Sequence, residues 1–250
     1  MGTLLKIEFT KLIKKKDVIL ISSLMIILPL IMALLFRFNV GGLTLQGQLA
    51  PQDYGMIVWS FLKMLFVLYI IPIYIPCTFI GREVEQRSIN MLLSKEKRNN
   101  ILLSKIIMSL AYITIFMVLF FIVSYAGFKI FLTGSEYELL DLTAATTASK
   151  YLMMYVLQWL EMIFVTLLAV LLNTVIKGNV ALVLGFGCIA IEKALQSLDM
   201  LKSYVPTFIS DFNNMVGMSN ELFSKSVLIY IIYLFVLLFI SFMWWKKREF

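Results

Sequence analysis

The chain of 250 residues contains no histidine and only two cysteines. Without histidine, the chain cannot build His-ligated zinc sites, serine–histidine triads or cysteine–histidine pairs, the usual means of intramembrane hydrolysis and acyl transfer. The two cysteines, Cys77 and Cys188, fall in apolar segments near opposite ends of the predicted fold, so no disulfide is expected between them. We therefore expect a non-catalytic protein.

Charged residues are also scarce, at 15% of the chain, whereas 61% of the residues are hydrophobic. The mean hydropathy of +0.92 is typical of a membrane protein. The net charge of +7 is spread over short strips beside apolar runs. Such strips indicate membrane lipid as a partner, and a nucleic-acid partner is not expected.

Six apolar segments predict an all-α integral membrane protein, with one transmembrane domain that covers residues 1–250. A bilayer core of about 30 Å needs about 20 apolar helical residues. The predicted spans are residues 18–36, 56–80, 104–128, 151–176, 178–193 and 226–245. The fifth span has few apolar residues before Glu192 and Lys193, so it must thin the bilayer, extend past these charges, or return as a hairpin.

Two amphipathic regions flank these spans. Near the N-terminus, Leu5, Phe9, Leu12 and Ile13 share one helical arc and lysines lie opposite, which predicts a helix at the inner membrane interface. A basic tail that only sets the topology is the alternative. Residues 194–225 mix polar and apolar side chains and predict short helices at the outer interface.

Basic residues predict the orientation of the spans. With the N-terminus inside, the inner segments hold more than twice as many lysines and arginines as the outer segments. Because basic residues concentrate in cytoplasmic loops, we expect both termini in the cytoplasm.

The connection between the second and third spans, "GREVEQRSINMLLSKEKRNNILLSK", is longer than its topology requires. Ile89, Leu92 and Leu93 recur at the spacing i, i+3, i+4, which predicts a short amphipathic helix on the cytoplasmic side. Helix connections usually need only two to eight residues. The patterned segment therefore indicates a docking surface for a partner.

This connection resembles the cytoplasmic loop of type-2 ABC exporter permeases. That loop carries an acidic residue, a small polar residue, a leucine pair, a basic residue and a lysine that opens the next span. In this chain they are Glu85, Ser88, Leu92 with Leu93, Arg98 and Lys105. The chain departs from many relatives at Ser94, where they have proline, and at residues 87–88, where they have Gly–Thr. The resemblance assigns ATPase coupling to Glu85, Arg87, Ser88, Ile89, Leu92, Leu93 and Arg98.

The resemblance implies the permease subunit of an ABC exporter in a bacterial plasma membrane. The patterned connection would be its coupling helix. Two permeases, identical or related, would work with two copies of a separate ATPase that binds ATP and magnesium. The implied substrates are amphipathic or hydrophobic peptides, exported as toxins or antimicrobial peptides or removed for self-protection (immunity).

The chain itself has no nucleotide-binding loop. The nearest match, residues 42–49, has Gln48 and Leu49 where a phosphate loop needs lysine and serine or threonine. ATP must therefore come through another polypeptide. The alternatives are an ATP-independent channel or secondary transporter, and a scaffold or sensor that does not transport.

Two charged residues, Lys63 and Glu161, fall deep inside predicted spans. A lone charge in a bilayer costs at least about 2.5 kcal/mol on insertion scales, so each must face protein, water or an opposite charge. They are candidates for a translocation path between two permease copies, and a structural ion pair is the alternative.

Prolines and tryptophans mark other points of the spans. Pro72 and Pro76 predict a bend in the second span. Trp59, Trp244 and Trp245 fall at predicted span ends and are interpreted as interface anchors.

Overall fold

The structure, a computed structural model, describes residues 2–40, 47–86, 88, 89, 92, 96–139 and 148–248. Within these residues the fold is helical, and the β-structure is limited to an isolated bridge between Leu49 and Glu138. The predicted all-α class is confirmed.

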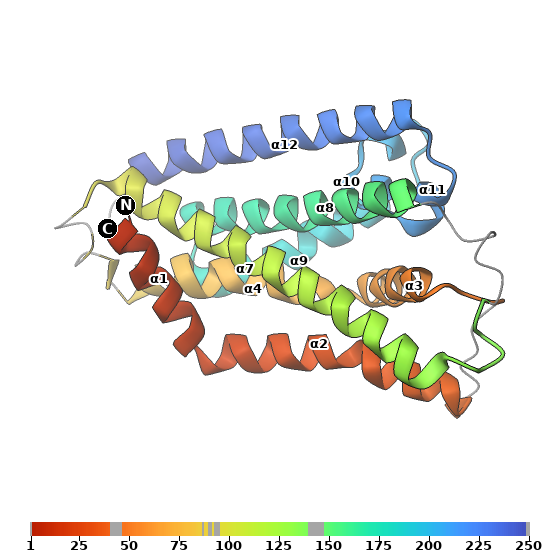
Figure 1. The fold of residues 1–250 in the computed structure, drawn as a ribbon. Coiled ribbons are helices and arrows are strands. Elements are labelled where there is room, and N and C mark those ends of the chain that lie inside the picture. Colours follow the sequence, from red (N-terminus) through yellow and green to blue (C-terminus); the bar gives the residue numbers. More distant parts are fainter. Residues whose placement is uncertain are drawn as a thin grey trace.

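Six helical segments of the described chain are long and apolar enough to cross a membrane, which is consistent with a multi-pass membrane protein. They run between two ends of the bundle (Figure 1), and α1 and the last turn of α12 lie at the same end, here called the terminal end. The opposite end is called the distal end. The six segments are Lys16–Arg37, Val67–Glu85, Arg98–Leu132, Ser149–Val175, Gly178–Leu195 and Asn220–Lys247.

The helix α8 lies at the centre of the bundle. It contacts α12 on one side and α4 on another, and α7 runs obliquely across the bundle toward α2 (Figure 1). In the most apolar stretch of α8, 67% of the residues are buried, whereas in that of α12 only 22% are. The principal helices are α1 (Gly2–Lys14), α2 (Lys16–Arg37), α7 (Arg98–Gly127), α8 (Ala148–Val175), α9 (Gly178–Leu195) and α12 (Asn220–Lys247).

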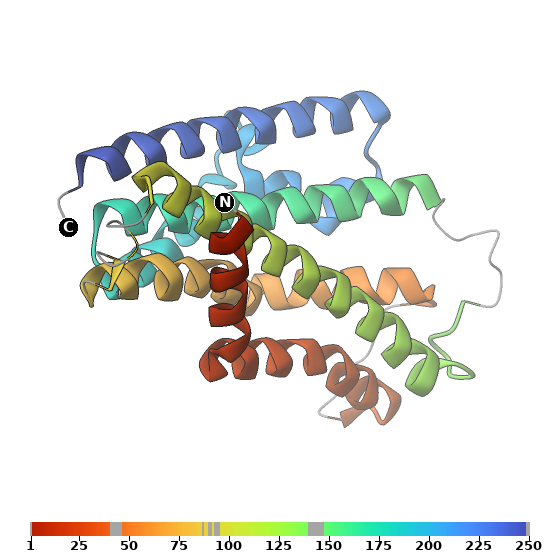
Figure 2. The same ribbon diagram turned by 60° about the vertical axis from the view of Figure 1, so that its left-hand side comes forward.

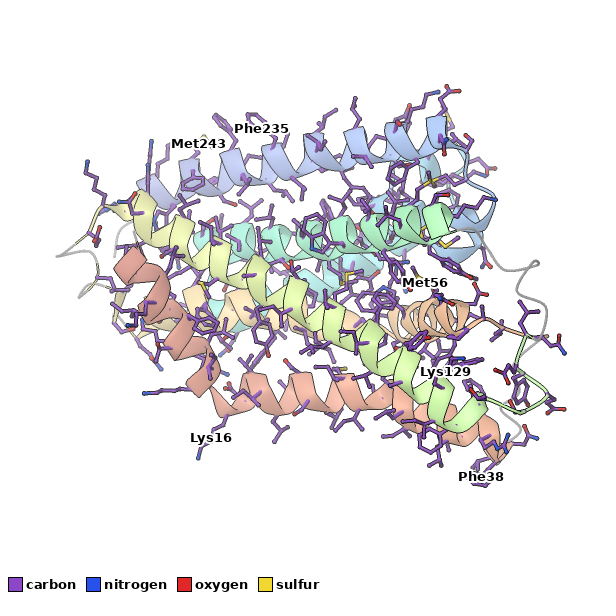
Figure 3. All side chains as sticks on the ribbon, viewed as in Figure 1. Lys16, Phe38, Met56, Lys129, Phe235 and Met243 are labelled. Atoms are coloured by element: carbon purple, nitrogen blue, oxygen red, sulfur yellow. The ribbon has the colours of Figure 1, made fainter. Side chains whose placement is uncertain are left out.

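Apolar side chains also cover the outside of the bundle. Phe235 and Met243 of α12 point away from the other helices (Figure 3), and 69% of the Phe235 side chain is exposed. An outer surface of this kind is expected where lipid tails, and not water, are the solvent.

The second predicted span is not one continuous helix. The helix α3 ends at Met64, and Phe66 then adopts a left-handed backbone conformation with φ of 62°. In Figure 1, α3 is seen more nearly end-on than α4, whereas in Figure 2, after a turn of 60°, α3 is seen from the side, so the chain changes direction at this break. The parts of this span are α3 (Pro51–Met64), η2 (Val67–Tyr69), α4 (Ile70–Pro76), η3 (Cys77–Gly81) and α5 (Arg82–Glu85).

The break lies before the two prolines that predict a bend. Pro72 is at the start of α4, and Pro76 is followed by the π-helical turn η3. Proline lacks the backbone N–H and disturbs the regular i to i−4 hydrogen bonds, which is consistent with a wider turn after Pro76. The break itself lies at Phe66, for which the sequence carries no proline or glycine signal.

The two amphipathic regions differ in how well they follow the prediction. Two short helices, α10 (Pro206–Ile209) and α11 (Phe212–Val216), lie at the distal end as expected for residues 194–225. The buried side of α1, by contrast, contains Glu8 together with Leu4 and Leu12. The predicted apolar arc is therefore divided, because Phe9 and Ile13 of the same arc are exposed.

The terminal end contains a close crossing of η3 and α9. A methyl group on Gly81 would lie 2.5 Å from Cα of Gly178 and would also meet Oδ1 of Asn173. Because its closest neighbours include backbone atoms, the crossing requires glycine at this position.

We expect Gly81→Ala to lower the free energy of unfolding by roughly 1–3 kcal/mol, because the added methyl group must push α9 away. The midpoint of thermal unfolding of the protein in lipid nanodiscs measures this loss. The control is Gly187→Ala on α9, where an added Cβ has no atom within 4 Å. Equal unfolding midpoints for the two variants would contradict the close crossing.

Candidate functional site

The break in the second span brings together the two deep charges that the sequence indicates. Nζ of Lys63, near the end of α3, lies 2.5 Å from Oε2 of Glu161 on α8. The Lys63 side chain is 7% exposed and that of Glu161 is fully buried. The structural ion pair that the sequence left as an alternative is therefore formed.

Neutral polar groups complete the hydrogen bonding of this ion pair. Nζ of Lys63 also donates to Oγ and the carbonyl oxygen of Ser210, at 3.0 and 3.1 Å, and to Oε1 of Gln158 at 3.2 Å. Tyr69 OH donates to Oε1 of Glu161 at 2.6 Å. Buried charges are tolerated when their remaining donors and acceptors are satisfied in this way.

Trp59 belongs to the support of this pair. Its Nε1 donates to Oε1 of Gln158 at 2.7 Å, and its ring packs against Phe120 and Phe121 at centroid distances of 5.0 and 5.1 Å. The side chain is fully buried, so its interpretation as an interface anchor is wrong.

Trp245 is likewise buried, and its Nε1 donates to the carbonyl oxygen of Arg98 at 2.9 Å. It therefore joins α12 to the start of α7. Trp244 is exposed, and its role as an interface anchor stays a prediction.

Lys193 stabilises the backbone at the break. Its Nζ donates to the carbonyl oxygens of Lys63 and Met64, at 2.9 and 3.4 Å, and lies 4.3 Å from the centroid of the Phe66 ring. A helix end leaves carbonyl groups without partners, and a cation placed there is favourable. The fifth span thus extends past its terminal charges, to Leu195, and uses one of them to close the gap in the second.

A cavity of about 530 Å³ adjoins the ion pair. Its wall combines residues of α3, α9 and the short distal helices, and its polar lining includes Ser60, Lys63, Lys193, Gln196, Asp211 and Asn213. Among the described residues, no group of three or more acidic or thiol side chains could hold a metal ion. Because polar side chains line it, the cavity can accept a polar or charged group beside the break.

Lys63→Met should lower the free energy of unfolding by roughly 3–5 kcal/mol, because it leaves the Glu161 carboxylate buried without its cation. The double variant Lys63→Met with Glu161→Met should recover most of that loss, since it removes both buried charges. Thermal unfolding in lipid nanodiscs measures all three proteins. Additive losses in the double variant would show that the two side chains do not interact.

A second charged cluster lies at the terminal end. Nζ of Lys105 on α7 lies 2.7 Å from Oε2 of Glu83 and 3.2 Å from Oε1 of Glu8. Lys11 of α1 is 2.9 Å from Oε1 of Glu83. These four residues, called the terminal charge cluster, connect α1, α5 and α7. The sequence reasoning missed Glu8, although it is the single acidic residue of α1.

The environments of two lysines near the cluster differ. Burial alone would lower the pKa of Lys11, but the hydrogen bond and attraction of Glu83, together with Glu8, outweigh burial and raise it. Burial is the main influence on Lys15 and lowers its pKa. Lys15 donates to the carbonyl oxygen of Thr78 at 2.7 Å, and its Nζ lies 4.6 Å from the Phe79 ring. Lys11 is therefore held by acidic side chains, whereas Lys15 is held by a backbone carbonyl oxygen and an aromatic ring.

The two flanks of the predicted coupling segment are bound to other helices. Oε1 of Glu85 accepts a hydrogen bond from the backbone N–H of Gly178 at 2.9 Å. Nη1 of Arg98 donates to the carbonyl oxygens of Lys246 and Arg248, at 3.3 and 3.2 Å. Each flank thus joins the end of a span to a neighbouring helix.

Only part of the coupling segment itself is described. Ser88 donates to the carbonyl oxygen of Glu83 at 3.2 Å, Ile89 is buried and Leu92 is half-buried. Arg87 and Leu93 lie outside the described residues, together with residues 90, 91, 94 and 95. The predicted coupling helix therefore stays a prediction.

Lys105→Gln is expected to lower the free energy of unfolding by roughly 3–5 kcal/mol, because Glu8 and Glu83 lose their shared cation. It should also free α1 from the bundle, which limited proteolysis at the lysines of α1 would detect. Lys14→Gln, at an exposed position of α1, is the control. Protection of α1 in both variants would contradict a structural role for the cluster.

A comparison with models of known protein families matches none of them, and a comparison with curated proteins finds no significant match. The site must therefore be interpreted from its own geometry.

Proposed function

We propose that this chain is the permease subunit of an ATP-driven ABC exporter in a bacterial plasma membrane. Two permeases, identical or related, are moved by two copies of a separate ATPase, which binds ATP and magnesium. Both termini lie in the cytoplasm. The observation that best supports this proposal is the binding of both flanks of the 86–97 connection to other helices.

A force on this connection reaches several helices at once. At its start, Glu85 bonds to the first residue of α9. At its end, Arg98 bonds to the last carbonyl groups of α12 and its neighbour, and Lys105, about two turns farther along α7, belongs to the terminal charge cluster with α1. These contacts connect the two ends of the connection to α9 and α12, as a segment that transmits a force requires. They support docking of a partner at residues 86–97.

The break gives such a force a place to act. The segment from α4 to α5 lies between the connection and Phe66, so movement at the connection would change the angle between α3 and α4. The cavity is lined by α3 before the break and by Tyr69 after it, so a change of that angle would alter its shape. Packed segments that change their relative angle at a few residues are the usual means of such transitions.

The proposed substrates are amphipathic or hydrophobic peptides, carried for secretion or for self-protection. A groove of about 570 Å³ between α7 and α8 supports an apolar substrate. Its lining includes Met117, Phe121, Tyr125, Tyr155, Val156 and Trp159. Aromatic and methionine side chains adapt to ligands of varied shape.

An ATP-independent channel or secondary transporter is the second candidate. The broken span, with its buried ion pair beside a cavity, favours it. Discontinuous helices with ionisable residues near the membrane centre are typical of secondary transporters.

The test is transport of an amphipathic peptide into liposomes that contain the purified chain and an ATPase co-purified from the native host. We expect uptake only with the ATPase and ATP. Leu92→Asp should reduce it at least about tenfold, because a charge at an apolar contact costs ~2 kcal/mol or more. Lys97→Gln, at an exposed position of the same connection, is the control. Rapid flux from the chain alone under an ion gradient would favour the second candidate.

A further inference from the structure

Glu192, beside Lys193 on α9, is a half-buried residue whose carboxyl group has no partner among the described residues. Its Oε2 is buried and accepts no hydrogen bond. In the part of the chain that the structure describes, Glu192 takes part in no ion pair and no hydrogen bond. It nevertheless interacts electrostatically with Glu161 and Lys63. It therefore adjoins the ion pair without belonging to it.

The lysines and the tyrosine around the ion pair already donate to other groups. Lys63 donates to Glu161 and to neutral oxygens of α8 and the Ser210 turn. Tyr69 donates to Glu161, and Lys193 donates to the carbonyl oxygens at the end of α3. Neither lysine is bonded to Glu192.

The other titratable groups around Glu192 offer no cation. On α12, Tyr230 donates to the carbonyl oxygen of Pro206 at 2.7 Å, and Tyr233 to that of Tyr204 at 3.0 Å. Cys188, one turn earlier on α9, is a free thiol. Asp211, which interacts electrostatically with Lys193, adds another negative charge at the cavity.

An ionised Glu192 would thus be a second carboxylate beside Glu161 with no cation of its own. A buried charge without a partner is strongly unfavourable, and neighbouring carboxyl groups avoid double ionisation by retaining a proton. We propose that Glu192 is a proton-binding site, which holds a proton while Lys63 pairs with Glu161 and Lys193 holds the break. When either lysine is freed, the carboxyl group releases its proton to solvent, which reaches the half-buried Glu192.

Proton binding and the shape of the second span are therefore linked. An ionised Glu192 attracts Lys193, and this attraction competes with the carbonyl oxygens that Lys193 stabilises at the break. Proton binding to Glu192 changes the equilibrium constant for release of Lys193 from the break by some factor. By thermodynamic reciprocity, release of Lys193 changes the proton affinity of Glu192 by the same factor. This link requires no ATPase and is independent of the proposed exporter function.

Infrared spectroscopy of the full chain in lipid nanodiscs tests the site directly. A protonated carboxyl group has a carbonyl stretching band that shifts in heavy water, and a carboxylate lacks it. We expect the band in the wild type at neutral pH, and its loss as the pH is raised. Glu192→Gln should lack it. Glu221→Gln, which changes an exposed carboxylate 2.8 Å from Lys225, should retain it.

The absence of the band from the wild type at neutral pH would overturn the proposal, as would a band of full intensity in Glu192→Gln. A carboxylate signal that follows sodium concentration at constant pH would also overturn it, because the occupant would then be a metal cation. If Glu192→Gln does not fold, the wild type still tests the proposal, because the absence of the band at neutral pH would overturn it.

Discussion

The pairing of Lys63 with Glu161 is the constraint on which the distal half of this bundle depends. An apolar bundle can contain two charges only if they meet and their remaining donors and acceptors are satisfied. That requirement holds α3 against α8. It also brings Ser210, between the short distal helices, into the bundle, where its backbone and side-chain oxygens both bind Lys63. The polar arrangement thus determines how the last third of the chain returns to the core.

The terminal end follows the same physical rule with different partners. There one buried lysine, Lys105, meets two carboxylates from different elements. The close contact of Gly81 with Gly178 adds a steric constraint to this electrostatic one. The two ends therefore differ in kind. The terminal end joins helices through shared charges and a close backbone contact, whereas the distal end contains a break, a cavity and Glu192, whose carboxyl group has no partner in the described part of the chain.

The sequence predicts all spans but the second well, because length and hydropathy decide whether a helix can cross a bilayer. It also indicates Lys63 and Glu161, because charges are rare in such segments. It does not predict the break, since Phe66 is neither glycine nor proline and its left-handed conformation depends on tertiary contacts such as that of Lys193. The burial of Trp59 was missed for another reason. In a membrane protein, residues that face lipid and residues that face protein are equally apolar, so hydropathy cannot separate the two.

The division of α1 into buried and exposed sides follows the same reasoning. Leu12 and Ile13 are neighbours of similar hydrophobicity, yet only Leu12 is buried. A helical wheel finds amphipathic character, but Glu8 faces the bundle because Lys105 lies there. Such pairs between distant residues leave no periodic pattern in the chain.

The conformation of Phe66 has an energetic consequence for the whole span. A bulky residue with positive φ costs about 1–3 kcal/mol, and a hydrogen bond to a charged group contributes about 1.5–3 kcal/mol. The strain at Phe66 and the contacts of Lys193 are thus of the same order and act in opposite directions. The fold therefore keeps this strained residue in an apolar segment because a cation from another helix offsets its cost.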